Sequence, residues 1–476
     1  MGIGEDFCGF LVSRKVEERG KAFYNCFYVY YRKSAGKYMS AKAFCGLLHK
    51  YLFAAAQLLF AASAVAQEVN INFDGGPAPA KSFMQAALVV DTALPPVPAA
   101  ASLKKWTVMV YVNGRNNLEY WGLTDVNEME TVGSSPDVNV VVELGRTTSY
   151  AVSDGDWAGS RRYLIWKDDD PYHIASPVLQ EIPQPDMGDW KHLVEFGGWA
   201  KQNFPAQHYM LIVWNHGSGW NKLLKADTLK GISYDYDTKN HISTPQLAQA
   251  LAAIGKVDVY ASDACLMQMA EVDYEIRKAA DYIVGSEESE PGEGFTYDAL
   301  LNPLVNRPGM TAEDLGRLAV NSYADHYQPL NKGTTMSLVR TSALPALLSN
   351  ASAFADAVMN SNALEAAKKA RTEARKFYFP YDKDLYDFVR LAMSYVQTPE
   401  VSGAGKKLLA FLERDLVIYH RYTGEKYVNT HGLSVYLPDD KYNPNYDELA
   451  WSKAGSWNEF VNWLLTPPPP APAFAK

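Results

Sequence analysis

Two residues that could act together as a nucleophile and its base follow two similar stretches of this sequence. Cys265 lies in the turn after the apolar stretch VDVYASD, and His216 lies in the turn after the apolar stretch HYMLIVW. A thiol becomes a better nucleophile when a neighbouring base or cation lowers its pKa. Parallel strands deliver their carboxyl ends to one edge of a sheet, so we expect Cys265 and His216 to meet there as a Cys–His dyad.

The residues around the dyad suggest how a substrate would be held. His216 stands in the run NHGSGW, whose glycines allow close backbone approach, and we expect the N–H groups of Gly217 and Cys265 to stabilise an oxyanion. A carboxylate aimed at the sulfur would raise the thiol pKa, so Asp263 is interpreted as part of a pocket wall. The alternative is that Asp263 caps a helix beginning near Leu266.

The sequence before residue 67 has the layout of an export signal. Residues 39–66 place lysines ahead of an Ala/Leu/Phe run and end in the small-residue motif AVA, which is typical of a signal peptide. Residues 1–38 are therefore interpreted as an over-extended start, with a non-cleaved aromatic anchor as the alternative. We expect a secreted or periplasmic protein with no stable membrane anchor after signal removal.

Removal of that signal would leave one cysteine in the mature chain. The other three, Cys8, Cys26 and Cys45, all precede residue 67. In an oxidising compartment a lone cysteine has no internal disulfide partner, so it is either buried and inert or kept free because it reacts. The place of Cys265 in a turn after a strand favours the second alternative, a free and reactive thiol.

Length and charge narrow the range of partners. A mature chain of about 410 residues can bury a large core in one α/β domain with additions, or in two domains. The net charge is −9, and Lys and Arg are scattered without the clustering that nucleic-acid binding needs. We expect no nucleic-acid partner, and a positively charged substrate would suit the balance of charge.

Alternating apolar runs and helical patterns predict an α/β fold with a parallel sheet. Residues 67–105 are Ala- and Pro-rich and are interpreted as a linker or pro-segment. Strands are expected at 106–112, 138–144, 208–214, 257–263 and 282–286, with a smaller one at 161–166, and helices at 118–132, after Asp189, after Ser243 or Thr244, and after Met269. Residues 106–300 would form the catalytic core.

The character of the sequence changes after Thr296. Helical patterns there alternate with two isolated strands, TTMSLV and GLSVYL, and a last helix is expected near 458–465. Residues 301–465 are interpreted as a C-terminal α+β portion packed on the core. Residues 466–476 are rich in proline and are expected to be disordered.

The arrangement resembles the clostripain family of cysteine peptidases, within the caspase-like clan. The matching stretches are WTVMVYV, NNLE, MGD, HYMLIVWNHGSGW, SDACLM, SEESEPGEGF, DLYDF and HGLSVYLP, which run across almost the whole mature chain. The resemblance implies a caspase-like, mostly parallel sheet covered by helices on both faces. It also implies an endopeptidase that cleaves after Arg or Lys, with His216 and Cys265 as dyad and Asp263 in the wall that receives the basic side chain.

Further expectations follow for residues near the site. Glu293 is expected to be the second acid of the pocket, ahead of Glu287 or Glu288. The family tends to be cut internally, and Lys230, then Lys225 and Lys222, are the expected self-cleavage points.

Some members of the family depend on calcium, but no calcium-loop motif is present, and Asp235 and Asp237 are too few to predict a metal site. Arg115 departs from the family pattern, in which an acidic residue is common at this place.

Two other function classes fit the same sequence. A peptidase fold can be kept as a non-catalytic secreted binding protein, although that class would be expected to lose a member of the dyad, and both are present. A thioester intermediate can also be passed to an amine, as in a peptide ligase, and sequence does not distinguish this from hydrolysis. A monomer that acts on protein or peptide substrates without a cofactor is the expected form.

Overall fold

The computed structural model describes residues 11–18, 21–28, 103–148, 150–220 and 231–467. The chain divides into two compact units, Met1–Leu94 and Pro95–Lys476. In the first unit, β1 (Leu11–Glu18) and β2 (Lys21–Tyr28) pair as an antiparallel hairpin. The expected signal peptide, nearly all of the linker and most of the Pro-rich tail lie outside the described residues.

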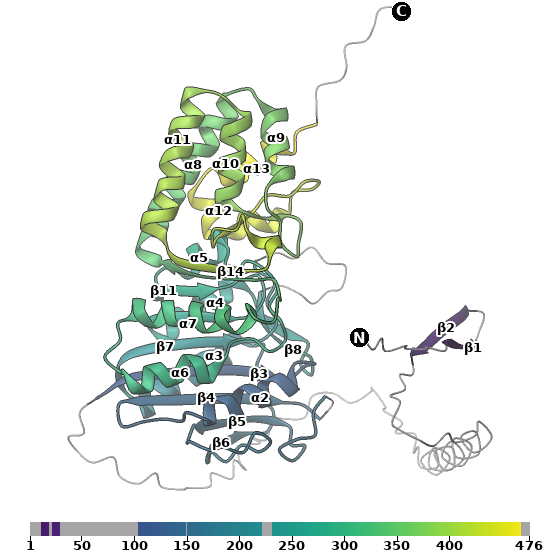
Figure 1. Ribbon diagram of the computed structural model, residues 1–476, viewed down its shortest axis with the longest axis vertical. Helices are drawn as coiled ribbons and strands as arrows, with labels where there is room; N and C mark the ends of the chain where they lie inside the picture. Colours follow the sequence, from purple (N-terminus) through teal and green to yellow (C-terminus); the bar gives the residue numbers. More distant parts are fainter. Residues whose placement is uncertain (1–10, 19–20, 29–102, 149, 221–230, 468–476) are drawn as a thin grey trace, which may run out of the picture. The chain divides into compact units, whose positions relative to one another are not determined.

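One nine-stranded sheet organises the second unit (Figure 1). In order across the sheet the strands are β14 (Val417–Thr423), β12 (Thr334–Arg340), β11 (Ala280–Gly285), β10 (Val257–Asp263), β7 (Ala206–Trp214), β3 (Lys104–Gly114), β4 (Val138–Arg146), β5 (Gly159–Leu164) and β6 (Val178–Ile182). The strands from β11 to β4 are mutually parallel, and antiparallel strands extend both edges. This sheet confirms the predicted fold class.

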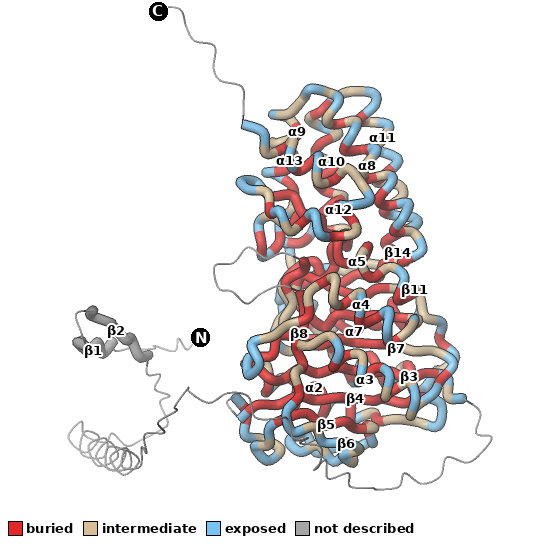
Figure 2. Tube along the Cα trace, turned by 180° about the vertical axis from the view of Figure 1, so that it is seen from behind, coloured by how far each residue is buried: buried red, intermediate tan, exposed pale blue. Residues whose placement is uncertain are grey.

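Helices cover both faces of the sheet because its central strands are apolar on both sides. Successive residues of β3 point to opposite faces, so Val110 packs on one face and Met109 and Tyr111 on the other. The first face is covered by α2 (Glu119–Glu130), α6 (Tyr297–Asn306) and α7 (Ala312–Tyr327), and the second by α3 (Trp190–Asn203), α4 (Thr244–Ile254) and α5 (Ala270–Ile276). Figure 2 shows the central strands buried along most of their length.

The helices that lead into β7 and β10 begin at the expected caps. Asp189 accepts a hydrogen bond from the backbone N–H of Lys191 at the start of α3. Ser243 and Gln246 form a capping box at the start of α4, which also carries Pro245 in its first turn. These caps satisfy backbone N–H groups that the first helical turn leaves unpaired, and so fix where each helix starts.

The C-terminal portion extends the sheet as well as packing on it. The strands β12 and β14 lie beyond residue 300, so the sheet crosses the boundary expected there. Helices gather beyond this end of the sheet (Figure 1), namely α8 (Leu344–Asn360), α9 (Leu364–Glu373), α10 (Leu385–Tyr395), α11 (Pro399–Phe411), α12 (Ala450–Ala454) and α13 (Trp457–Leu464). The GLSVYL stretch forms β15 (Ser434–Tyr436), which pairs with β13 (Asp382–Asp384) outside the main sheet.

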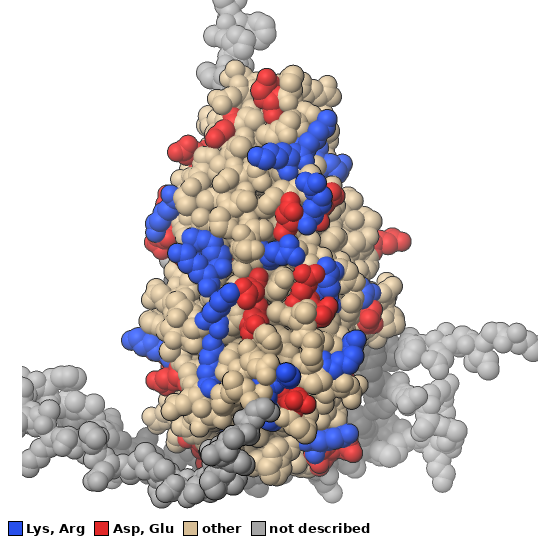
Figure 3. Space-filling model, turned by 90° about the vertical axis from the view of Figure 1, so that its left-hand side faces the viewer, with Lys and Arg blue, Asp and Glu red and all other residues tan. Residues whose placement is uncertain are grey.

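Two further features of the structure concern the hydropathy of its helices and the distribution of its surface charge. Within the described part of the chain, none of the helices is long and apolar enough to cross a membrane. On the face drawn in Figure 3, Lys and Arg side chains are interspersed with Asp and Glu. That face therefore carries both signs of charge intermixed.

Candidate active site

The register between β7 and β10 brings the two predicted catalytic turns to one edge of the sheet. The strands are adjacent and parallel, and Trp214 at the end of β7 pairs with Asp263 at the end of β10. The pairing continues one step further, because the backbone N–H of Asn215 donates to the carbonyl of Asp263 over 3.1 Å. His216 and Cys265 then leave the sheet at matching positions.

The two turns touch through a glycine. A Cβ atom placed on Gly217 would lie 2.3 Å from the carbonyl oxygen of Cys265, closer than any real side chain could come. Just past the cysteine, Leu266 adopts a left-handed φ of 64°, which is costly for a residue with a side chain. Its N–H donates to the carbonyl of Glu288 over 3.1 Å, which helps hold the turn in this conformation.

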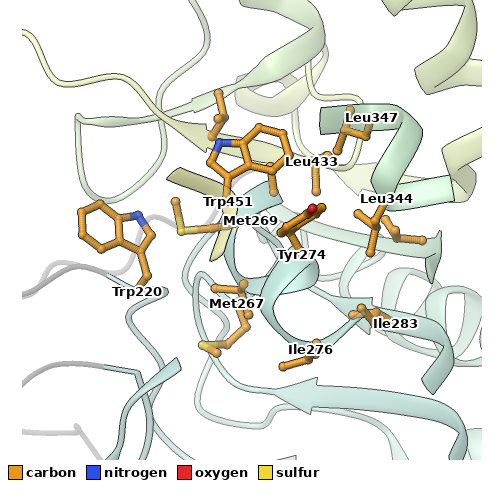
Figure 4. Close-up of a cluster of buried hydrophobic side chains, with 14 of the residues drawn as sticks. Trp220, Met267, Met269, Tyr274, Ile276, Ile283, Leu344, Leu347, Leu433 and Trp451 are labelled. Atoms are coloured by element: carbon orange, nitrogen blue, oxygen red, sulfur yellow. The ribbon is translucent and has the colours of Figure 1, made fainter. Parts of the chain in front are cut away.

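Both turns are anchored in the same buried apolar cluster (Figure 4). Trp220 follows the His216 turn, and Met267 and Met269 follow Cys265, and all three side chains are buried in this cluster. The C-terminal portion contributes Leu433 and Trp451. The packing fixes the backbone on the downstream side of both turns.

The imidazole of His216 is half-buried and held on two sides. Its Nε2 atom lies 2.8 Å from Oδ1 of Asn117, and its ring is stacked on Tyr236 with the planes 13° apart. An amide oxygen only accepts hydrogen bonds, so Nε2 carries the proton and Nδ1 is free to accept one. Burial lowers the pKa of His216 to about 4, so the ring is neutral at physiological pH.

The sulfur of Cys265 is half-buried beside an apolar cluster. It accepts a hydrogen bond from the backbone N–H of Glu290 over 3.2 Å and packs against Leu266, Phe377, Phe379 and Tyr427. Burial, followed by the negative charge of Glu290, raises the pKa of the Cys265 thiol to about 12. The resting pair is thus a neutral thiol and a neutral imidazole.

Two carboxyl groups lie together beside this turn. Asp263 is buried and accepts hydrogen bonds from the Phe295 N–H over 3.1 Å and from the Tyr297 hydroxyl over 2.9 Å. The carboxyl oxygens of Glu290 are also buried, find no hydrogen-bond partner in the described part of the chain, and lie close enough to Asp263 for each carboxyl group to affect the pKa of the other. Two buried acids that lie close together cannot both ionise readily.

The pKa values of both acids are raised. Burial is the largest cause of the shift in each group, and it raises the pKa of Asp263 to about 6. Burial and the charge of Asp263 raise the pKa of Glu290 well above its ordinary value. Asp263 is therefore the acid of the pair that ionises more readily, and its carboxylate would be a suitable partner for one cationic group.

The other acids expected in the pocket have hydrogen-bond or ion-pair partners of their own. Glu293 is more than a third exposed and pairs with Lys332 over 3.1 Å. Glu288 accepts hydrogen bonds from the Tyr427 hydroxyl and from the backbone N–H of Tyr378, and Glu287 accepts one from the Gly432 N–H. The structure places Glu290 beside Asp263, and Glu293, Glu287 and Glu288 have other partners.

The charges of Asp235 and Asp237 are matched by the chain itself. The guanidinium of Arg115 lies 2.7 Å from Asp235 and 2.9 Å from Asp237. Among the residues that the structure describes, no group of three or more His, Cys, Asp or Glu side chains is placed to hold a metal ion. Arg115, the departure from the family pattern, thus supplies the positive charge in this turn.

Two residues of this site were not predicted from the sequence. Asn117 stands in the polar turn NGRNN, where the sequence does not indicate the direction of any one side chain. Glu290 stands in SEESEPGEGF among three other glutamates, and nothing in that stretch distinguishes it. The three lysines expected as self-cleavage points, Lys222, Lys225 and Lys230, lie outside the described residues.

The sequence model of the clostripain family matches residues 110–463. This chain belongs to the clostripain family. Clostripain from Hathewaya histolytica is 30% identical over 232 residues, a match that spans 44% of this chain and 44% of that relative's length. The chain therefore covers less than half of the curated relative that it matches.

Solved structures of clostripain-family proteins share the fold. A secreted C11 cysteine protease from Bacteroides thetaiotaomicron, in complex with an irreversible peptide inhibitor, has a TM-score of 0.54 at 21% identity and is matched over 76% of this chain and 99% of that chain. An inactive zymogen C11 protease from Parabacteroides distasonis has a TM-score of 0.53 at 22% identity, with the same coverage of 76% and 99%. These likenesses confirm the caspase-like fold class.

Proposed function

We propose that this clostripain-family chain is a secreted cysteine endopeptidase that hydrolyses peptide bonds after Arg or Lys. The observation that carries the proposal is the buried acid pair of Asp263 and Glu290 beside the Cys265 turn. Glu290 also donates its backbone N–H to the cysteine sulfur, so one residue joins the pocket to the nucleophile. A guanidinium or ammonium group beside these acids would be held by charge-assisted hydrogen bonds and would supply the partner that the Glu290 carboxyl oxygens lack.

In the proposed mechanism, Cys265 is the nucleophile and His216 transfers the protons. The Cys265 sulfur bonds to the carbonyl carbon of the residue in the acid pocket while the thiol proton passes to Nδ1 of His216. The N–H groups of Gly217 and Cys265 donate to the oxyanion. As the C–N bond breaks, His216 returns the proton to the leaving amine, which leaves a thioester on the cysteine.

Hydrolysis of the thioester completes the cycle. His216 takes a proton from water as the water oxygen attacks the thioester carbon, and the C–S bond breaks to release the carboxylic acid. The proton on His216 then returns to the cysteine sulfur. The neutral state of the resting imidazole suits it to accept a proton in both half-reactions.

Fluorogenic peptides that differ only in their last residue test this proposal. We expect hydrolysis after Arg, Lys or both, little after Leu or Asp, and none by the Cys265→Ala variant. Hydrolysis of no peptide by the wild-type chain would contradict the peptidase proposal and favour a binding protein. Product analysis with an added amine distinguishes a ligase, which would yield the amide instead of the acid.

A further inference from the structure

An aromatic segment of the C-terminal portion lies beside the cysteine. Phe377 and Phe379, between α9 and β13, are buried against Leu266 and Tyr427, and Cys265 packs on this cluster. Tyr378 between them is different, because it is 66% exposed. Its ring meets that of Phe379 edge to face, with 5.1 Å between the ring centroids. A large aromatic ring is thus left open to solvent on the segment whose neighbouring side chains pack with Cys265.

Glu288 ties this segment to the turn that holds the sulfur. Oε1 of its carboxyl group accepts the backbone N–H of Tyr378 over 3.0 Å, and Oε2 accepts the Tyr427 hydroxyl over 2.7 Å. Two residues further along the same turn, Glu290 donates its N–H to Cys265. The position of the Tyr378 backbone is therefore fixed relative to the nucleophile.

The proposed mechanism indicates which residue of a substrate would contact Tyr378. His216 gives a proton to the leaving amine, so residues after the cleaved bond must depart on the side of His216 and Asn117. In the proposed function the basic side chain binds beside Asp263, which accepts hydrogen bonds from Phe295 and Tyr297. The residue before the basic one would then leave the cysteine on the side of the aromatic segment, whose Phe377 and Phe379 lie in the cluster on which Cys265 packs.

We propose that Tyr378 forms the binding site for the residue that precedes the Arg or Lys, and that this site selects an apolar side chain. The inference rests on the proposed function of the same active site. An aliphatic or aromatic side chain would cover the open ring and remove apolar surface from water. The buried carboxyl groups of Glu288 and Glu290 nearby disfavour an acidic side chain at this position.

Dipeptide substrates test the inference directly. A series X-Arg with a fluorogenic leaving group and X as Leu, Phe, Gly or Asp is assayed on the purified protein. We expect kcat/KM for Leu and Phe to exceed that for Gly on the order of tenfold, with Asp lowest. In Tyr378→Ala the ratio of Leu to Gly should fall below about threefold, and Tyr378→Phe should restore most of it.

Tyr172→Ala is a matched control, because Tyr172 is also exposed, at 70%, and lies in the connection between β5 and β6 at the other edge of the sheet. It should keep the wild-type ratio, and all variants should keep the wild-type melting temperature. Equal rates for Leu and Gly in the wild type, or an unchanged ratio in Tyr378→Ala, would overturn the inference while leaving the proposed peptidase activity intact. Failure to hydrolyse any Arg or Lys substrate would instead count against the proposed function.

Discussion

In the proposed mechanism, Asn117 determines which nitrogen of His216 takes up the thiol proton. Its amide oxygen lies 2.8 Å from Nε2 and so leaves Nδ1 as the basic atom. We predict that Asn117→Ala lowers kcat on the order of tenfold with a smaller change in KM, because the ring loses a preferred tautomer and orientation. Steady-state kinetics with an Arg substrate measures the change.

Asn117→Asp separates positioning from a general loss of structure. The carboxylate would keep the hydrogen bond and stabilise the imidazolium, so the pKa of His216 should rise from about 4. The acid limb of the kcat profile should therefore move to higher pH in this variant. A profile identical to that of the wild type would argue that Asn117 does not act on the imidazole.

The pocket acids predict a second pH dependence. The pKa of Asp263 is raised to about 6, so the pair loses negative charge as the pH falls through that value. We predict that kcat/KM for an Arg substrate rises with pH through about 6, well above the range in which His216 titrates. A Leu substrate should lack this step, because it needs no charge in the pocket.

Variants of Asp263 and Glu290 test whether these acids cause the rise of kcat/KM with pH. Asp263→Asn and Glu290→Gln should each cost an Arg substrate on the order of tenfold to a hundredfold in kcat/KM, and a Leu substrate much less. Glu293→Gln serves as the comparison, since its side chain pairs with Lys332 instead. Equal losses for Arg and Leu substrates would make Asp263 a structural residue.

The sequence predicted where the Cys265 and His216 turns would lie better than it predicted the acids around them. Cys265 and His216 each follow an apolar strand, and strand register then determines where they lie. Glu290 and Glu293 stand in an irregular segment without periodicity, where the direction of a side chain depends on contacts distant in sequence. Only the fold shows that one of these glutamates turns inward to Asp263.

At the scale of elements, the approach of the His216 turn to the Cys265 turn depends on Gly217. A Cβ there would lie 2.3 Å from the Cys265 carbonyl oxygen and 3.0 Å from the Cβ of Ala264. We predict that Gly217→Ala forces the two turns apart, abolishes activity and destabilises the fold by roughly 1–3 kcal/mol. Denaturant unfolding and turnover measure the two effects.

Gly198→Ala is the control for this substitution. Gly198 lies in α3, is exposed, and a Cβ there would meet nothing within 4 Å. Alanine favours a helix over glycine by roughly 0.5–1 kcal/mol, so the variant should be as active as the wild type and slightly more stable. Wild-type activity in Gly217→Ala would mean that the turns do not need this close contact.

Elements with a strong local signal were predicted well. Runs of β-branched residues marked β3 and β4, and the caps at Asp189 and Ser243 marked the starts of α3 and α4. Runs of β-branched residues did not show which neighbouring strand each strand would pair with. TTMSLV entered the main sheet as β12, while GLSVYL formed β15 against β13, because pairing depends on long-range packing and not on strand propensity.

At the scale of the whole molecule, the segment that carries Lys222, Lys225 and Lys230 connects two halves of one sheet. The strands from β3 to β7 precede it, and β10, β11, β12 and β14 follow it. The central pair β7 and β10 joins the halves, with partners from Val259 and Met210 to Asp263 and Trp214. A break in this segment would therefore leave the sheet's hydrogen bonds and its apolar core in place.

We propose that the chain cuts itself in this segment, with Lys230 favoured because a glycine follows it. An enzyme that accepts Lys would meet these lysines in its own chain or in a neighbouring copy. If the mature chain begins near Gln67, we predict that the purified wild type runs as fragments of roughly 160 and 250 residues in a denaturing gel, yet elutes as one species natively, whereas Cys265→Ala stays intact. Lys230→Ala should slow the cut or move it to Lys225 or Lys222. Identical cutting of the wild type and Cys265→Ala would assign the cut to another protease, and an uncut, fully active wild type would show that activity does not depend on this segment being cut.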